Sequence, residues 1–216
     1  MSTAKIVLQA ASITTSLVSA GGIASLSLFD IPELRAQPAS RSLPGVRWLF
    51  SRGSHIFPAA SLLAATGFTC LAFVSHPGAA TQIFRLAANS TTVNLYLAAA
   101  AINAGNFVWT PAIMIPTNFA LIELKENIGG TRSAQAAREK QYGAGDRTAE
   151  DSVNGKGDST SQLRDVSGPQ TKSDRQSTPE EDQQADALLA KFGKLNAVRS
   201  LFPGVGGLVG LLAALL

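Results

Sequence analysis

Polar side chains recur at helical spacing within one apolar stretch of the sequence. They are Asn103, Asn106, Thr110 and Thr117. Steps of 3, 4 and 7 residues place them on one face of a helix. Polar groups in lipid are costly unless they face protein or a cavity, and the nearby Pro111 and Pro116 free backbone carbonyls that a cavity can use. The pattern predicts an inward-facing surface that lines a cavity. Hydrogen bonding to a neighbouring helix is the alternative for Asn103 and Asn106.

The residue types limit the chemistry that such a cavity could support. His55 and His76 are 21 residues apart, about 31 Å along one helix, so they cannot share an ion. The apolar stretches contain no cysteine cluster and no paired carboxylates, and no glycine-rich phosphate loop follows a strand. The sequence therefore predicts no metal, haem, hydrolase or nucleotide site. Nucleic acid is not expected as a partner, because acidic and basic residues nearly balance in the polar part of the chain.

Charge is distributed unevenly along the 216 residues. Residues 125–194 hold 11 of the 18 basic and 12 of the 15 acidic residues. The remainder contains four apolar stretches, most of them near or beyond the roughly 20 residues that cross a bilayer. They lie at about 4–29, 58–74, 92–124 and 197–216. The sequence thus predicts a single membrane domain over 1–216, an all-α four-helix transmembrane bundle, with a helical lead-in to the second span from about Pro44.

Residues 130–185 are rich in Ser, Gly, Gln and charged side chains and contain almost no bulky apolar residue. Such a segment buries too little apolar surface to fold alone, so we expect a long disordered loop between the third and fourth spans. Basic residues flank the first and third loops: Arg35, Arg41, Arg47, Arg52, Lys125, Lys191 and Lys194. The positive-inside rule then predicts that these loops are cytosolic, with both termini and the 76–90 loop lumenal, in a multi-pass endomembrane protein.

An up-down-up-down bundle brings particular ends of the spans together. The ends of spans one and three lie beside the starts of spans two and four. We therefore expect His55, Asn118 and Arg199 around one cavity at the cytosolic end. Simpler interpretations remain open: His55 at the level of the lipid headgroups, Arg52 as an interfacial anchor, Arg199 snorkelling, and Trp109 filling the core.

Three motifs carry a resemblance to a known family. They are RGSHIFP at 52–58, WTPAIMIPTNFALIEL at 109–124 and NAVRS at 196–200. Together they resemble the fungal anthrone oxygenase family, small four-span membrane proteins encoded beside aromatic polyketide synthases. The likeness covers all four spans, and the long polar loop looks like an insertion relative to shorter members.

The resemblance implies a monooxygenase that oxidises a polyketide anthrone to an anthraquinone. Molecular oxygen would be the co-substrate, with no metal, flavin or other cofactor. The catalytic residues implied are His55 as general base, Arg199 as the cation for the enolate, and Asn118 as a hydrogen-bond donor. The residues expected to bind the substrate are Arg52, Phe107, Trp109, Thr110, Met114 and Thr117.

Two other classes of protein fit the same features. One is a non-catalytic membrane scaffold that holds polyketide tailoring enzymes, and the other is a small exporter of the polyketide. A scaffold should tolerate loss of His55 and Arg199, whereas an exporter should move its substrate without changing its absorbance. In each case the lipid bilayer is the immediate partner of the spans.

Overall fold

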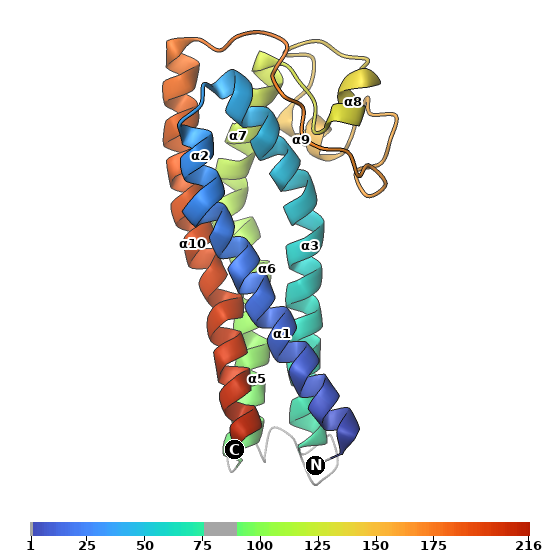
Figure 1. The fold of residues 1–216 in the computed structure, drawn as a ribbon, viewed down its shortest axis with the longest axis vertical. Helices are drawn as coiled ribbons and strands as arrows, with labels where there is room; N and C mark the ends of the chain where they lie inside the picture. Colours follow the sequence, from blue (N-terminus) through green and yellow to red (C-terminus); the bar gives the residue numbers. More distant parts are fainter. Residues whose placement is uncertain (1, 76–89) are drawn as a thin grey trace. The chain divides into compact units, whose positions relative to one another are not determined.

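The computed structural model describes residues 2–75 and 90–216 of the chain. Within these residues the secondary structure is helical and includes no strand. Four helical segments are long and apolar enough to cross a bilayer: Thr3–Arg35, Ala39–Val74, Thr91–Ile128 and Pro179–Leu215 (Figure 1). The prediction of an all-α chain with four transmembrane helices is therefore confirmed. Residues 76–89, which form most of the predicted lumenal loop, lie outside the described residues.

The first helical segment consists of α1 (Thr3–Ser25), η1 (Leu26–Asp30) and α2 (Ile31–Arg35). It has no charged side chain between Lys5 and Asp30, as a lipid-facing helix requires. Pro32 lies in the first turn of α2, where its missing N–H costs no helical hydrogen bond. The segment continues past the predicted end near residue 29, and Arg35 pairs there with Asp186 of α10 at 2.7 Å.

The second segment is a single helix, α3 (Ala39–Val74), of 36 residues. At 1.5 Å per residue it is about 54 Å long, so part of it must extend beyond a hydrocarbon core of about 30 Å. The predicted span at 58–74 and its helical lead-in are both present, and the helix begins at Ala39 rather than near Pro44. The Ala39 backbone N–H donates to Oδ1 of Asp182 at 2.7 Å, so a side chain of another helix caps α3.

The third segment is built from four pieces: α5 (Thr91–Ala104), α6 (Asn106–Trp109), η3 (Thr110–Met114) and α7 (Ile115–Ile128). Ser90 caps its start by accepting a hydrogen bond from the Val93 backbone N–H at 3.4 Å. Gly105 separates α5 from α6, and Pro111 lies within the π-helical turn η3. A proline removes a backbone donor and crowds the preceding turn, so the helix widens locally.

The fourth segment, α10 (Pro179–Leu215), has 37 residues and begins well before the predicted span at 197–216. Its first turn contains Glu180 and Glu181, which suit the positive end of the helix dipole. Thr178 and Glu181 form reciprocal side-chain to backbone hydrogen bonds at 2.8 and 3.3 Å, a capping box. Local capping therefore starts this helix inside the segment that was predicted to be disordered.

The chain divides into two compact units, and each is described by itself. Unit 1 comprises Met1–Ser25, Phe57–Ala112 and Asn196–Leu216, and unit 2 comprises Leu26–Ile56 and Ile113–Leu195. Each of the four helical segments contributes residues to both units. The described residues of unit 1 contain Lys5 and Arg199 and no Asp or Glu, whereas unit 2 holds most of the charged residues.

The core of unit 1 is a cluster of small and aromatic side chains. Its buried members are Ala64, Phe68, Leu71, Ala72, Val93, Tyr96, Ala99, Ala100 and Ala213. The rings of Phe68 and Tyr96 stack with their centroids 6.4 Å apart. A Cβ added at Gly210 would overlap the Phe68 ring, so this helix contact requires glycine. Small residues let membrane helices approach closely, which is how unit 1 packs.

Hydrogen bonds between buried side chains link the helices of unit 1. Gln9 of α1 donates to the Tyr96 hydroxyl of α5 at 2.7 Å. The Ser16 hydroxyl lies 2.8 Å from Oδ1 of Asn103 and 2.7 Å from the Pro203 carbonyl oxygen. Because lipid offers no partners, such pairs fix the register of the helices that carry them.

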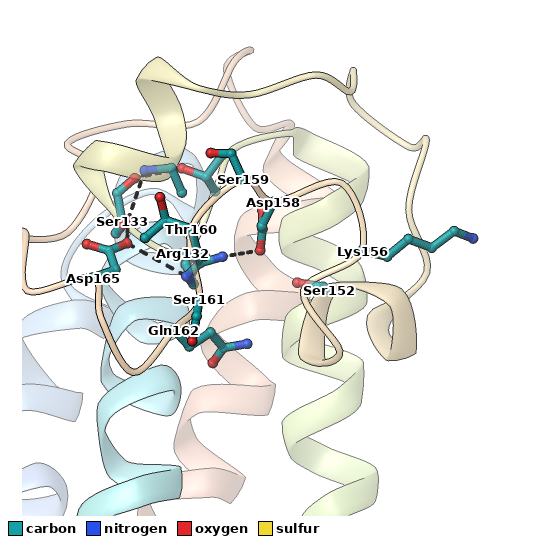
Figure 2. A network of polar contacts seen from close by, with 12 residues as sticks. Arg132, Ser133, Ser152, Lys156, Asp158, Ser159, Thr160, Ser161, Gln162 and Asp165 are labelled. Atoms are coloured by element: carbon teal, nitrogen blue, oxygen red, sulfur yellow. Dashed lines mark hydrogen bonds and ion pairs between the residues drawn. The ribbon is translucent and has the colours of Figure 1, made fainter.

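The segment between α7 and α10 has a defined fold, contrary to the expectation of disorder over 130–185. It contains α8 (Ala134–Arg138) and α9 (Ala149–Val153), and its core is formed by charged rather than apolar side chains. Figure 2 shows Arg132, which is 2% exposed, between Asp158 and Asp165. Arg147 pairs with Glu126 at 3.2 Å and with Asp158 at 3.1 Å. These ion pairs supply the cohesion that apolar burial does not.

This segment is also attached to α3. Arg47, which is buried, donates to the Ser152 carbonyl oxygen at 2.8 Å and to the Ser152 hydroxyl at 3.1 Å. The ring of Tyr142 lies 3.9 Å from the Arg147 guanidinium, and burial raises the pKa of its phenol. Arg47 of the first loop thus serves as an internal anchor for this segment.

Replacing Gly206 by alanine should destabilise unit 1 by about 1–3 kcal/mol. A Cβ at this position overlaps the Asn103 amide, which is held by Ala99 and Ser16. Gly204→Ala is the matched control, because its Cβ would meet only the Ala20 Cβ at 3.6 Å. Thermal unfolding in detergent micelles compares the two variants, and equal unfolding temperatures would contradict the packing at Gly206.

Replacing Arg132 by methionine should destabilise the fold of residues 129–178 by about 3–5 kcal/mol, because it leaves a buried carboxylate without its cation. Limited proteolysis of the purified protein should then cut this segment faster. Lys156→Met is the control, since Lys156 pairs with Asp151 through a side chain that is 74% exposed. If both variants are cut at the parent rate, the buried ion pairs do not hold the segment together.

Candidate functional site

Unit 1 contains a cavity of about 160 Å³ at the point where the third helical segment is interrupted. Its lining residues are Pro58, Ser61, Asn106, Phe107, Thr110, Pro111 and Arg199. They come from α3, α6, η3 and α10. Three of them, Phe107, Thr110 and Arg199, are among the residues predicted to bind substrate or catalyse its reaction.

The irregular backbone of the third segment positions this lining. Asn106 starts α6 directly after Gly105, and Thr110 and Pro111 open the π-helical turn. A π-turn shifts the side chains that follow it relative to a regular helix, and such turns are frequent at functional sites. Pro111, which lies in this turn and lines the cavity, therefore helps to shape it.

The polar groups of the cavity are only partly paired. The Asn106 amide donates to the Ser61 hydroxyl oxygen at 3.0 Å. Within the part of the chain that the structure describes, Oδ1 of Asn106 is buried and accepts no hydrogen bond from the protein. The cavity thus offers an amide oxygen and two hydroxyl groups, from Ser61 and Thr110, beside apolar walls.

Arg199 brings a positive charge to the cavity. Its guanidinium carbon lies 5.5 Å from the centre of the Phe57 ring, a cation–π arrangement. Its Nε has no hydrogen-bond partner among residues 2–75 and 90–216, and none of the ion pairs found there includes Arg199. The described residues of unit 1 contain no Asp or Glu that could pair with this cation.

Trp109 belongs to unit 1 but does not line the cavity. Its ring packs on Phe202 of α10 with the centroids 5.9 Å apart. This contact matches the alternative interpretation, in which the tryptophan fills the core of the bundle. Substrate stacking by Trp109 stays a prediction.

The other predicted site residues belong to unit 2. His55 is exposed and lines a second cavity of about 460 Å³ together with Arg132, Asp158 and Leu163. Arg52 donates to the Ser167 carbonyl oxygen at 3.1 Å and lies over the Trp48 ring. These contacts fit the interpretation of Arg52 as an anchor beside the membrane.

Met114, Thr117 and Asn118 line neither of the two cavities. Met114 and Thr117 are buried at 0% and 2% exposure. Oδ1 of Asn118 is buried and, among the described residues, accepts no hydrogen bond. The two cavities have no lining residue in common, so a joint site of His55, Asn118 and Arg199 stays a prediction.

Sequence reasoning did not single out Ser61, and it treated Asn106 as a face residue rather than as part of the site. A lone serine in an apolar run gives no signal of its own, because its hydroxyl is commonly satisfied by the backbone of its own helix. The helical spacing of Asn103, Asn106 and Thr110 was the signal available in the sequence. The structure shows that these three residues do not share one role. Asn103 bonds to α1, and the other two line the cavity.

Comparison with protein families identifies the region that carries this cavity. The family model described as anthrone oxygenase matches residues 47–148. Residues 47–148 belong to the anthrone oxygenase family. The matched region begins within α3 and includes all of α5, α6, η3 and α7, whereas Arg199 lies beyond it. No curated protein and no solved structure matches the chain.

The match to the anthrone oxygenase family model supports the resemblance, and it includes the motifs at 52–58 and 109–124 but not the one at 196–200. Together with four apolar helices, it indicates a membrane-embedded oxidoreductase with an oxygenase-like function. Among the described residues, no three His, Cys, Asp or Glu side chains lie together as metal ligands. Independence from a metal or another cofactor stays a prediction.

Proposed function

We propose that the protein is a monooxygenase that converts an aromatic polyketide anthrone to the anthraquinone with molecular oxygen, in secondary metabolism. The family of residues 47–148 supports the class of reaction. The observation that carries the proposal is the cavity of unit 1, which is lined by Arg199, a cation that belongs to none of the ion pairs found among the described residues. The substrate supplies an anionic partner for this cation when the substrate ionises.

The proposed chemistry is balanced and needs little from the protein. The methylene carbon of the anthrone loses a proton, and the electron pair delocalises onto the ketone oxygen to give an enolate. The enolate transfers one electron to oxygen, and the two radicals combine to form a carbon–oxygen bond. The resulting hydroperoxide loses water, so one anthrone and one O2 give one anthraquinone and one H2O. No external reductant is required.

Arg199 is assigned the role of stabilising the enolate oxygen. A cation in an apolar cavity acts more strongly than in water, because the low dielectric does not screen it. Removing one such oxyanion-stabilising group typically lowers the rate about 10²–10³-fold. Asn106 and Ser61 fix the neighbouring wall through their mutual hydrogen bond, and Thr110 offers a further donor.

The size of the cavity requires adjustment when a tricyclic substrate binds. Its volume of about 160 Å³ is below the roughly 300–1,000 Å³ usual for small-molecule pockets. Phe107 lines the cavity and is 43% exposed, so its ring has room to turn. We propose that Phe107 moves aside and then covers one face of the anthrone.

His55 is retained as the proposed general base, with Asn118 as a hydrogen-bond donor. Histidine is the most common general base in enzymes, and the exposed side chain of His55 is accessible to water. We also propose that oxygen reacts without metal or flavin and that the protein resides in an endomembrane. Both termini would then be lumenal, the first and third loops cytosolic, and tailoring enzymes the neighbours on the cytosolic side.

Arg199→Met should reduce anthrone oxidation about 10²–10³-fold in membranes containing the protein. Arg199→Lys should restore part of the rate, because it keeps the charge. Quinone absorbance and oxygen uptake measure the reaction, with protein-free membranes giving the spontaneous rate. Arg41→Met is the control, since Arg41 is also an arginine of the helical segments but is exposed in unit 2.

An anaerobic measurement distinguishes stabilisation of the enolate by Arg199 from a purely structural role of Arg199. Without oxygen, the parent should bind the anthrone as its coloured enolate, and Arg199→Met should bind it as the colourless ketone. If the parent shows no enolate and no oxidation above the protein-free rate, a scaffold is favoured. If it instead moves the anthrone across vesicle membranes unchanged, an exporter is favoured.

His55→Ala should slow the oxidation about 10²–10⁴-fold if His55 is the base. His76→Ala, which removes the other histidine of the chain, should leave the rate near that of the parent. Quinone absorbance under air measures both rates, with protein-free membranes giving the spontaneous rate. Equal rates for the two variants would remove His55 from the mechanism.

A further inference from the structure

A loop of unit 2, residues 161–168, shows an inverted arrangement of polar and apolar side chains. Leu163 is 71% exposed and Val166 is 86% exposed, whereas Asp165 between them is 2% exposed. In water the reverse is usual, with the carboxylate outside and the large apolar side chains inside. This loop, termed loop 161–168, is therefore arranged as if its outer side faced an apolar medium.

Hydrogen bonds to Asp165 hold the loop in this orientation. Its carboxylate accepts hydrogen bonds from the Ser133 hydroxyl and from the backbone N–H and hydroxyl of Ser167, the last two at 3.0 and 2.7 Å. Burial alone would raise the pKa of Asp165, but these bonds lower it below its ordinary value. Turning Leu163 and Val166 inward would require this ionised side chain to leave its partners.

Loop 161–168 lies against one particular stretch of α3. The Ser167 carbonyl oxygen accepts hydrogen bonds from Nε1 of Trp48 at 2.9 Å and from Nη2 of Arg52 at 3.1 Å. Leu163 and His55 line the same cavity. Figure 2 shows the neighbouring Gln162 at the turn of this loop. Loop 161–168 therefore lies beside α3 between Trp48 and His55.

The sequence of α3 predicts that the helix enters the membrane just after this stretch. Residues 56–75 contain no charged side chain, and twenty residues at 1.5 Å each match a hydrocarbon core of about 30 Å. Arg52 and His55 are the last ionisable side chains before that run. Tryptophan and arginine at such a boundary are typical of the interface between lipid and water.

We propose that loop 161–168 is a membrane-surface anchor that inserts Leu163 and Val166 into the boundary between headgroups and acyl chains. The bilayer around α3 is the occupant that the structure favours, because the exposed side chains continue an existing membrane interface. Arg164 stands between them, is exposed, and forms none of the ion pairs found among the described residues. Its charge would face the lipid phosphates.

Site-directed fluorescence tests the anchor in the full-length protein in liposomes. The single native cysteine is replaced first (Cys70→Ala), and cysteine is then introduced as Leu163→Cys, Val166→Cys or Lys156→Cys and labelled with an environment-sensitive dye. Lys156 is the matched control, because its side chain is 74% exposed in the same folded segment. Quenchers are attached to the lipid near the headgroup or dissolved in the water.

At positions 163 and 166 the dye should emit at shorter wavelength than at 156 and should be quenched several-fold more by the lipid-attached quencher. At position 156 the aqueous quencher should be the stronger one. Equal exposure of all three positions to the aqueous quencher would overturn the anchor. A shorter emission wavelength at 163 and 166 without quenching by lipid would also overturn it, because a protein partner would then cover the loop.

Discussion

Lipid provides no hydrogen-bond partners, and this constraint governs the organisation of unit 1. Several buried polar side chains in its apolar segments are paired across helices, as Gln9 is with Tyr96, Ser16 with Asn103, and Ser61 with Asn106. Each pair requires two helices to pack in one register. The Ser16–Asn103 pair also brings the Asn103 amide close to Gly206. Among the described residues Arg199 belongs to no ion pair, and it lines the cavity of unit 1, which is why the candidate site is placed around it.

Unit 2 meets the opposite requirement, since it must fold with few apolar side chains. Apolar runs and charge-free stretches were sufficient to predict the four helical segments, and helix ends were missed where charged residues continue a helix, as at Pro179. The fold of residues 129–178 could not be predicted in this way. Its ion pairs and hydrogen bonds join residues far apart in the sequence, such as Arg132 with Asp158 in an ion pair and Arg47 with Ser152 in a hydrogen bond. Composition alone does not reveal which of these residues pair.

Only some residues of the candidate site could be predicted from the sequence. Helical spacing and proximity to prolines indicated that Thr110 belongs to the site. The position of Arg199 at the start of the last apolar run indicated that it supplies the positive charge of the site. Ser61 was missed because serine is common in apolar helices, and Pro58 because it was treated only as part of a motif. The expectation of one shared cavity came from bundle topology. It could not anticipate that α3 contributes His55 to one unit and Ser61 to the other.

The roles proposed for Arg199 and His55 are energetically linked through the acidity of the substrate. One pKa unit corresponds to about 1.36 kcal/mol, and an oxyanion-stabilising group contributes about 2.7–4 kcal/mol. A cation beside the enolate oxygen would therefore lower the pKa of the anthrone methylene by about two to three units. A substrate acidified to this extent loses its proton to a weaker base, so part of the advantage of a histidine is replaced by water. Loss of both groups should then cost more than the sum of the single losses, because the histidine contributes most when the cation is absent.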